Sequence, residues 1–353
     1  MIMNSSFVTR ILEADYIPDI FIRHGIRNLL AQRLREESRS NPELQQAHLM
    51  QLVNNLRDSP IAINTAEANN QHYELPTNFY RFILGNHLKY SSCHFDKFDI
   101  TKAAQNLNSS EERMLELTCE RARLIDGEKI LELGCGWGSL SLWMAMHYPN
   151  SKITAVSNSR TQKLYIDAKA NECRIQNLEV ITCDINKLDF MPNIKFDRVV
   201  SVEMFEHTRN YQTLLARIAL WMNPKATLFI HIFTHKKYAY TFDIKNKSDW
   251  MAKFFFTGGI MPSDGLLHYF QEDLTLVDHW RVDGRHYQLT AEAWLANMDA
   301  HRFQIMPILA STYGQEHARR WWVYWRIFLM SCAELWGYRN GREWGVSHYL
   351  FKI

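Results

Sequence analysis

The stretch Lys129-Ile-Leu-Glu-Leu-Gly134-Cys-Gly136-Trp-Gly138 joins a short apolar run to three closely spaced glycines. Such a run followed by glycines is typical of a buried strand that turns sharply into a helix. Glycine suits this turn because the backbone must approach a ligand without a Cβ atom in the way. The stretch therefore predicts a ligand-binding turn at the carboxyl edge of a parallel sheet, although a purely structural glycine turn would have the same pattern.

Further apolar runs follow this turn at the spacing expected for alternating strands and helices. They begin at Lys152, Leu178, Phe196 and Thr227, and amphipathic stretches separate them. A last run, residues 344–351, has the character of a closing strand. The alternation predicts an α/β fold with a doubly wound, mostly parallel sheet.

The composition narrows the class of protein. Apolar residues make up 46% and charged residues 22% of the 353 positions, which is typical of a globular chain and excludes a disordered one. A net charge of +2 gives no field that would attract nucleic acid or an anionic membrane. Six irregularly spaced cysteines fit the reduced thiols of a cytosol. We therefore expect a cytoplasmic protein with no nucleic-acid partner and no stable membrane insertion.

The residues that follow the next two strands favour S-adenosylmethionine over a nicotinamide dinucleotide as the cofactor. The glycine spacing departs from G-x-G-x-x-G, and Ser157-Asn158-Ser159 stands where a dinucleotide enzyme carries an acidic ribose partner. The amides of Asn158 and Gln162 can hydrogen-bond a ribose diol. Asp184, at the end of the third strand, can accept a hydrogen bond from an adenine amino group.

An acidic cluster, Glu203-Met-Phe-Glu206-His207, comes directly after the fourth strand. In a helical turn, Glu206 and His207 would lie three and four residues beyond Glu203, so all three groups would point into one crevice beside the cofactor. Burial and mutual repulsion would raise the pKa of one carboxyl group, which suits proton transfer near neutral pH. A helix N-terminus that favours negative charge is the competing explanation.

Two histidines, His231 and His235, lie on the fifth strand and share one face because side chains alternate along a strand. One of them could line the crevice, but a satisfied core histidine explains each equally well. Two histidines without a third ligand do not make a metal site, so no metal is predicted.

Several motifs together resemble the cyclopropane-fatty-acid synthase superfamily, and within it the coclaurine N-methyltransferase branch. The motifs are Leu131-Glu-Leu-Gly-Cys-Gly-Trp-Gly, Ala155-Val-Ser-Asn-Ser, Val202-Glu-Met-Phe-Glu-His and Phe256-Thr-Gly-Gly-Ile-Met-Pro-Ser. The likeness extends over nearly the whole chain. It implies the seven-stranded fold of class I S-adenosylmethionine-dependent methyltransferases, with N-terminal helices, a helical aromatic-rich insertion and assembly as a homodimer.

The resemblance also implies roles for individual residues. The positions that match cofactor-binding ones are Tyr90 and Ser91 (closing over the cofactor), Gly134 and Gly136 (methionine part), Asn158 and Gln162 (ribose), and Asp184 with Ile185 (adenine). Glu203, Glu206 and His207 match the positions at which the N-methyltransferases hold an amine and remove its proton. On the substrate side, Glu206, His231 and Tyr287 match the positions at which the cyclopropane-forming branch holds a bicarbonate base.

Two departures from that lipid-modifying branch decide between acceptors. Ser92 stands where the lipid branch has Cys after Tyr-Ser, and Glu203 stands where it has a small residue, usually Gly. A carboxylate beside the acceptor attracts a cationic amine and opposes an alkene. We therefore favour N-methylation of a small aromatic or cyclic amine. The alternatives are methylation or cyclopropanation of unsaturated phospholipid acyl chains, and a cofactor-binding protein without catalysis.

These expectations divide the chain into four segments. Residues 1–115 form an N-terminal helical cap that includes the cofactor-covering segment, and residues 116–236 form the Rossmann-like cofactor-binding core. Residues 237–340 form the substrate-side insertion, and residues 341–353 add the closing strand to the core sheet.

Overall fold

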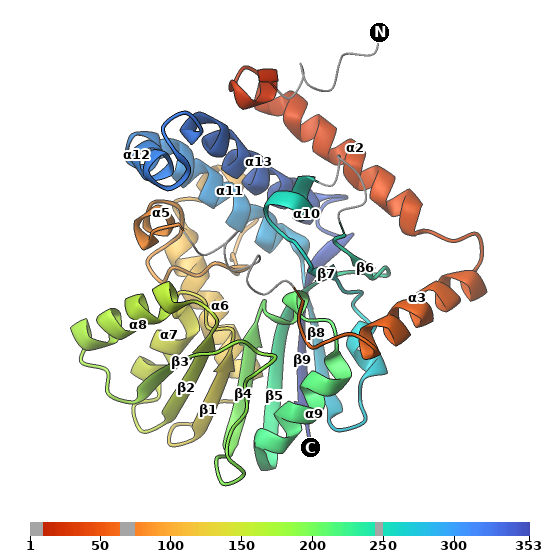
Figure 1. The fold of residues 1–353 in the computed structure, drawn as a ribbon, viewed down its shortest axis with the longest axis vertical. Coiled ribbons are helices and arrows are strands. Elements are labelled where there is room, and N and C mark those ends of the chain that lie inside the picture. Colours follow the sequence, from red (N-terminus) through yellow and green to blue (C-terminus); the bar gives the residue numbers. More distant parts are fainter. Residues whose placement is uncertain (1–9, 64–74, 244–249) are drawn as a thin grey trace.

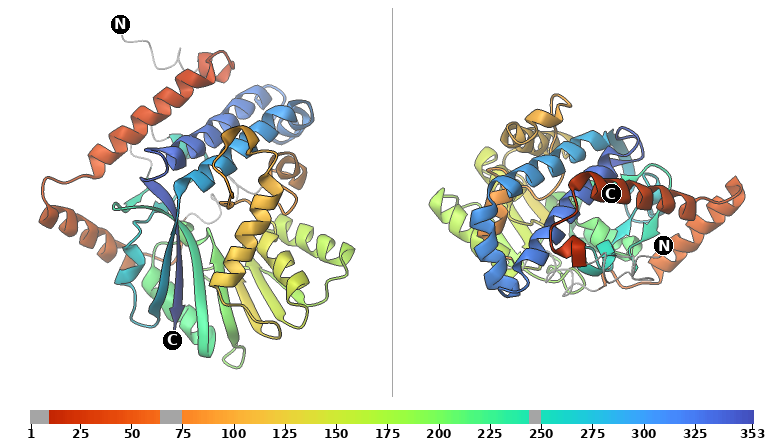
Figure 2. Two further views of the ribbon diagram at one scale, coloured as in Figure 1. Left: turned by 180° about the vertical axis from the view of Figure 1, so that it is seen from behind. Right: turned by 90° about the horizontal axis from the view of Figure 1, so that it is seen from above.

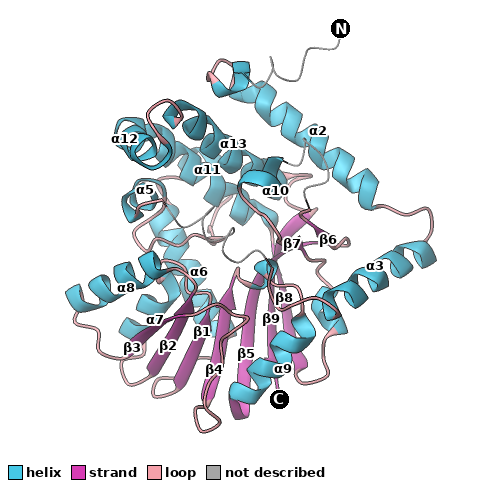
Figure 3. Ribbon diagram, viewed as in Figure 1, coloured by secondary structure: helices cyan, strands magenta, loops and turns pink. Residues whose placement is uncertain are grey.

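The computed structural model describes residues 10–63, 75–243 and 250–353. A twisted sheet flanked by helices forms one half of the molecule, and a layer of helices covers the upper edge of the sheet (Figure 1). Figure 3, coloured by secondary structure, shows the strands of the main sheet gathered below, with helices beside them and a further group of helices above.

Seven strands form the main sheet in the order β3-β2-β1-β4-β5-β9-β8. Their bounds are β1 (Lys129–Leu133), β2 (Lys152–Ser157), β3 (Leu178–Thr182), β4 (Phe196–Val202), β5 (Met222–His235), β8 (Thr275–Val282) and β9 (Trp344–Lys352). The first five run parallel to one another, and β9 runs antiparallel between β5 and β8. The predicted mostly parallel, seven-stranded sheet is confirmed. The strand β8 was not recognised in the sequence, because its burial is incomplete and its apolar pattern is weak.

The parallel strands are apolar on both sides because helices cover both faces. The helices α6, α7 and α8 lie on the face seen from behind in Figure 2, and α9 lies on the opposite face, beside α3. Their bounds are α3 (Pro42–Arg57), α6 (Leu107–Arg121), α7 (Ser139–His147), α8 (Arg160–Glu172) and α9 (Tyr211–Trp221). This arrangement leaves the carboxyl edge of the sheet as the place where the connecting loops meet.

The upper layer forms an aromatic core of its own. It contains α2 (Asp19–Glu37), α5 (Thr77–Ile83), α10 (Trp250–Phe254), α11 (Gly284–Ala300), α12 (Arg302–Tyr313) and α13 (Ala318–Gly337), with the short strands β6 (Tyr240–Thr241) and β7 (Ile260–Met261) below it. The helix α13 buries Trp322, Trp325 and Trp336 against its neighbours, which explains the late cluster of tryptophans. The N-terminal helix α2 is held on this layer by Arg23, which contacts Glu292 at 2.6 Å.

Three single turns of 3₁₀ helix complete the described elements: η1 (Ile100–Lys102), η2 (Phe205–His207) and η3 (Leu266–Tyr269). Within the described residues, no helix combines the length and the apolar character needed to cross a lipid bilayer.

Candidate active site

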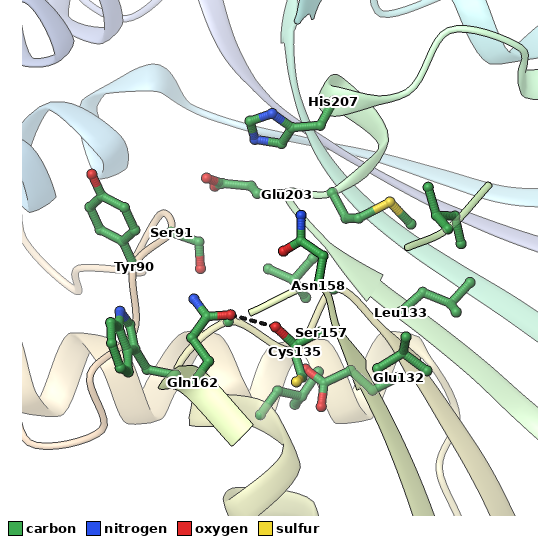
Figure 4. A pocket seen from close by; sticks show the side chains of 18 of the residues that line it. Tyr90, Ser91, Glu132, Leu133, Cys135, Ser157, Asn158, Gln162, Glu203 and His207 are labelled. Carbon is green, nitrogen blue, oxygen red and sulfur yellow. Dashed lines mark hydrogen bonds between the residues drawn. The ribbon is translucent and has the colours of Figure 1, made fainter. Parts of the chain in front are cut away.

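A pocket of about 1300 Å³, measured to its open mouth, lies where β1, β2, β3 and β4 end. Residues that directly follow these strands line its floor, and the segment 88–91 lines its opposite side. Figure 4 shows this arrangement: Glu203 and His207 lie across the space from Tyr90 and Ser91, with Gln162 and Asn158 below them in this view.

The glycine turn after β1 shapes the pocket floor. Gly134, Gly136 and Gly138 have φ angles of +81°, +52° and +78°, which side chains other than glycine rarely adopt. A Cβ atom on Gly134 would lie 2.6 Å from Cβ of Met204, and one on Gly138 would lie 2.6 Å from Cγ1 of Ile166. A Cβ atom on Gly136 would meet nothing within 4 Å, so this glycine faces open space. Packing therefore requires glycine at positions 134 and 138, and the missing side chain at position 136 keeps the pocket accessible.

The start of α8 presents an amide to the same space. The Ser157 hydroxyl donates to Oε1 of Gln162 at 2.6 Å, and Ser159 caps the helix by accepting from the Gln162 amide. The bond from the Ser157 hydroxyl turns Nε2 of Gln162 away from Ser157. This buried nitrogen has no hydrogen-bond partner within the described residues. A buried donor without an acceptor costs about 1–3 kcal/mol. A ligand that offers an oxygen acceptor, as a ribose diol does, would satisfy it, so the pocket fits S-adenosylmethionine on this side.

The remaining predicted cofactor residues also line the pocket. Tyr90 and Ser91 lie on its upper side, and the Tyr90 ring packs 5.5 Å from the ring of Trp294 in the helical layer. Asp184 and Ile185 follow β3, and Oδ1 of Asp184 accepts from the amide of Asn186 at 2.8 Å. All eight predicted cofactor positions therefore border one cavity.

Two ionisable groups of the pocket were missed in the sequence. Glu132, on β1, is 2% exposed, accepts from the Ser141 hydroxyl, and has a pKa raised to about 7 by burial. Lys89 is 1% exposed and donates to the Ser92 carbonyl at 2.7 Å, and burial lowers its pKa. Lys89 directly precedes Tyr90 in the sequence, but no local sequence pattern predicts that its side chain is buried or in which direction it points.

Glu203 is the most strongly held acidic group of the pocket. Its φ angle of +48° is in the left-handed region, so the chain turns at this residue as it leaves β4. Its Oε1 accepts from the amide of Ser92 at 2.9 Å and lies 3.1 Å from Nε2 of His231. Its Oε2 accepts from the hydroxyl of Tyr287 at 2.6 Å. Burial raises the pKa of Glu203, and the charge of Lys89 and these hydrogen bonds act in the opposite direction.

The three residues of the acidic cluster do not all point into the pocket. The predicted helical turn from Glu203 is wrong, because the left-handed backbone there delays the turn until η2, which starts at Phe205. Glu206 is fully buried and does not line the cavity. Its Oε1 accepts from the amide of Phe233 at 2.7 Å, and burial together with the charge of Glu203 raises its pKa well above the ordinary value.

His207 lines the pocket beside Glu203, and its ring lies 4.8 Å from the ring of Phe256. Burial lowers the pKa of His207 to about 4, and the charge of Glu203 opposes this shift. The imidazole is therefore neutral near pH 7 and has a nitrogen able to accept a proton.

His231 and Tyr287 do not border the cavity, but both reach Glu203 from the side away from it. His235, four residues further along β5, lies 3.3 Å from Glu343 and takes no part in this site. Among the described residues, no group of three or more His, Cys, Asp or Glu side chains is placed to hold a metal ion.

Comparisons with known proteins agree with this geometry. The profile of the family described as mycolic acid cyclopropane synthetase matches residues 62–341. (S)-coclaurine N-methyltransferase from Thalictrum flavum subsp. glaucum is 39% identical over 345 residues, covering 97% of this chain and 94% of that protein.

Two solved structures extend the comparison. A crystal structure of coclaurine N-methyltransferase bound to N-methylheliamine and S-adenosylhomocysteine superposes with a TM-score of 0.93 at 36% identity, covering 99% of both chains. The cyclopropane synthase MmaA2 from Mycobacterium tuberculosis has a TM-score of 0.68 at 20% identity, covering 84% of this chain and all of the other, and shares the fold.

The extent of these matches, across both the sheet and the helical layer, excludes a likeness limited to a common cofactor-binding fold. The residues that line the pocket also have the chemistry that S-adenosylmethionine requires. The chain therefore belongs to the mycolic acid cyclopropane synthetase family and is an S-adenosylmethionine-dependent methyltransferase that resembles the coclaurine N-methyltransferases over its whole length.

Proposed function

We propose that the protein transfers the methyl group of S-adenosylmethionine to the nitrogen of a small cyclic amine that carries an aromatic ring. The observation that carries this proposal is the Glu203 carboxylate, which lines the cavity and is held there by three hydrogen-bond donors. A fixed negative charge at the acceptor end of a pocket favours a basic amine and disfavours an apolar alkene.

The cofactor supplies an electrophilic methyl group, so the protein must place a neutral amine nitrogen in line with it. An amine is mostly protonated at pH 7, and its lone pair is then unavailable. Glu203 would hold the ammonium form on entry. Correct placement of the two reacting groups is worth about 7–11 kcal/mol.

His207 is the group proposed to take the proton from the amine, because it lines the cavity and is neutral near pH 7. The imidazolium ion that forms would lie beside the Glu203 carboxylate, whose charge favours it. General-base catalysis of this kind contributes about 10²–10⁴-fold in rate. Glu206, the other candidate base, is displaced from the cavity wall, and burial together with the charge of Glu203 raises its pKa well above the ordinary value.

The donors around Glu203 suggest how one family supports two chemistries. By resemblance, His231 and Tyr287 match positions that hold bicarbonate in the cyclopropane-forming branch. In this chain they bond to the carboxylate of Glu203. We propose that this side chain takes the place of a diffusible bicarbonate ion, so the enzyme needs none. Modification of a phospholipid acyl chain remains the alternative that this substitution opposes.

The test is to incubate the protein with methyl-labelled S-adenosylmethionine and, in parallel, with a panel of cyclic aromatic amines and with vesicles of unsaturated phospholipid. We expect label in the amines, as a gain of one methyl group by mass spectrometry, and none in the acyl chains. Label in the acyl chains alone would replace the proposal by the lipid reaction. Label in neither would support a binding protein without this catalysis.

A further inference from the structure

Two buried histidines and an arginine continue the hydrogen bonds of Glu203 away from the pocket. Nδ1 of His231 lies 2.9 Å from Nε2 of His348, and Nδ1 of His348 lies 2.8 Å from Nη1 of Arg121. Together with the 3.1 Å contact between His231 and Glu203, these bonds form one unbranched chain of four side chains. Both imidazole rings are fully buried.

The fold brings these four residues together from four separate parts of the chain. His231 on β5 and His348 on β9 are directly opposite each other in antiparallel register, so their side chains share one face of the sheet. Arg121 is the last residue of α6, the helix that crosses this face in the rear view of Figure 2. Its guanidinium lies over the ring of Trp280, which is opposite His348 on β8.

The arginine sets the direction of every hydrogen bond in the chain. A guanidinium group can only donate, so Nδ1 of His348 must be an acceptor. Neutral His348 then carries its proton on Nε2 and donates it to Nδ1 of His231. Neutral His231 must in turn carry its proton on Nε2, which donates to Oε1 of Glu203. Only one pair of tautomers satisfies all three contacts.

Both rings must be neutral for this argument to hold. Burial lowers the pKa of His231 and of His348 well below the ordinary value, and the positive charge of Arg121 acts in the same direction on both. An imidazolium at His231 would also place two N–H donors against each other at the contact between the rings, and an imidazolium at His348 would place an N–H donor against the guanidinium of Arg121. Geometry and charge therefore agree on two neutral rings.

We infer that Arg121 and His348 are positioning residues that fix the tautomer of His231, so that its Nε2–H is permanently directed at Glu203. The expected effect on catalysis rests on the proposed role of Glu203, whereas the assignment of the tautomers is independent of that role. One consequence is that the chain cannot carry a proton away from Glu203, because the nearest nitrogen already bears one. A proton taken from the substrate therefore has no exit along this chain of hydrogen bonds.

The effect on activity follows from the ionisation of Glu203. Each donor to a carboxylate favours its charged form, and hydrogen bonds to charged groups are stronger than those between neutral groups. If His231 lost its fixed tautomer, an acceptor nitrogen would face Oε1, and the carboxyl group would bind its proton more tightly. The other titratable groups that face Glu203 are Lys89, Cys93, Glu206, His207, Tyr287 and Cys332. The variants below leave all of these unchanged.

The first test needs neither cofactor nor substrate. The unliganded protein is labelled with ¹⁵N-histidine, and the ring-nitrogen signals of His231 and His348 are assigned with single variants. We expect both rings to be neutral near pH 7, with the proton on Nε2 and protected from exchange. A proton on Nδ1 of either ring, or an imidazolium, would overturn the inference while leaving the proposed reaction untouched.

The second test uses the pH dependence of kcat/KM for a methylated amine. His348→Phe keeps the volume but breaks the chain, and should move the acidic limb of the profile upward by about one pH unit or more. His348→Gln can still accept from Arg121 and donate to His231, so it should restore the wild-type limb. Arg121→Met, at the half-buried end of the chain, provides a second break if His348→Phe fails to fold.

The matched control is Phe229→Leu, which alters packing against His348, whose ring lies 5.1 Å away, without touching a hydrogen bond. Phe229→Leu should leave the acidic limb of the kcat/KM profile at the wild-type pH. Equal shifts in His348→Phe, His348→Gln and Phe229→Leu would mean that the chain acts only through packing, and the inference would then be wrong.

Discussion

Tyr287 donates its hydroxyl proton to Oε2 of Glu203 at 2.6 Å, across 84 positions of the sequence. The tyrosine comes from α11 in the helical layer, and the glutamate follows a strand of the sheet. One hydrogen bond therefore joins the two halves of the molecule at the acceptor end of the pocket. The charge of Glu203 in the pocket therefore also depends on the position of the helical layer relative to the sheet.

Tyr287→Phe should raise the pKa of Glu203, because the carboxylate loses a donor to its charged form. A hydrogen bond to a charged group is worth about 1.5–3 kcal/mol, which corresponds to about one to two pH units. We expect the rate to fall most below neutral pH and to recover as the pH rises. The measurement is kcat/KM against pH. The matched control is Tyr324→Phe, which removes a hydroxyl that donates to Glu13 at 2.6 Å, far from the site. An unmoved acidic limb in Tyr287→Phe would contradict the prediction.

Glu203→Ala should lower kcat by about 10²–10³-fold, as expected for the loss of one preorganised charge. The substitution leaves a small cavity that still contains the Ser92 amide, the His231 ring and the Tyr287 hydroxyl as donors. Added formate or bicarbonate should bind there and restore part of the rate, while neither ion should change the wild-type rate. In Glu203→Leu the side chain fills the same space, so no rescue is expected. If bicarbonate accelerated the wild type, Glu203 would not be its substitute.

Gln162→Glu should weaken binding of S-adenosylhomocysteine without disturbing the local fold. The new side chain can still accept from the Ser157 hydroxyl, but it no longer has the buried amide donor that lacks a partner within the described residues. The loss of one hydrogen bond and the added charge should raise Kd by about tenfold or more, measured by calorimetry. Gln304→Glu, an exposed change on α12, is the control and should leave Kd unaltered. An unchanged Kd in Gln162→Glu would place the ribose elsewhere.

Part of this site could be predicted because it lies at the ends of parallel strands. Gly134, Asn158, Asp184 and Glu203 each follow a strand of one parallel sheet, and such ends meet at the same edge. The position of the pocket at this edge of the sheet therefore follows from short local patterns.

The rest depends on contacts that local patterns do not encode. His348 faces His231 only because β9 inserts antiparallel beside β5 in one register, which no single segment determines. The direction of Glu206 was wrongly predicted because it depends on the left-handed backbone at Glu203, which is rare for a residue with a side chain. Glu132 was overlooked because it lies inside the apolar strand that leads into the glycine motif, and the sequence does not distinguish it from that motif.

Glu132→Gln should change how stability depends on pH in the cofactor-free protein. Burial raises the pKa of Glu132 from 4.5 to about 7. Below pH 4.5 the folded and unfolded forms are both protonated, so folding carries no penalty. As the pH rises, the unfolded chain loses this proton first, and stability falls until the folded group ionises near pH 7. The shift corresponds to a penalty of about 3 kcal/mol above that pH.

Glutamine keeps an oxygen that accepts from the Ser141 hydroxyl but does not ionise. The variant should therefore match the wild type near pH 4.5 and exceed its free energy of unfolding by about 3 kcal/mol at pH 8, measured by urea denaturation. Glu172→Gln, at a side chain 67% exposed on α8, should give a curve parallel to the wild type. If Glu132→Gln also ran parallel, the pKa of Glu132 in the folded protein would be close to its ordinary value, and a counter-charge or ordered water would have to compensate for its burial.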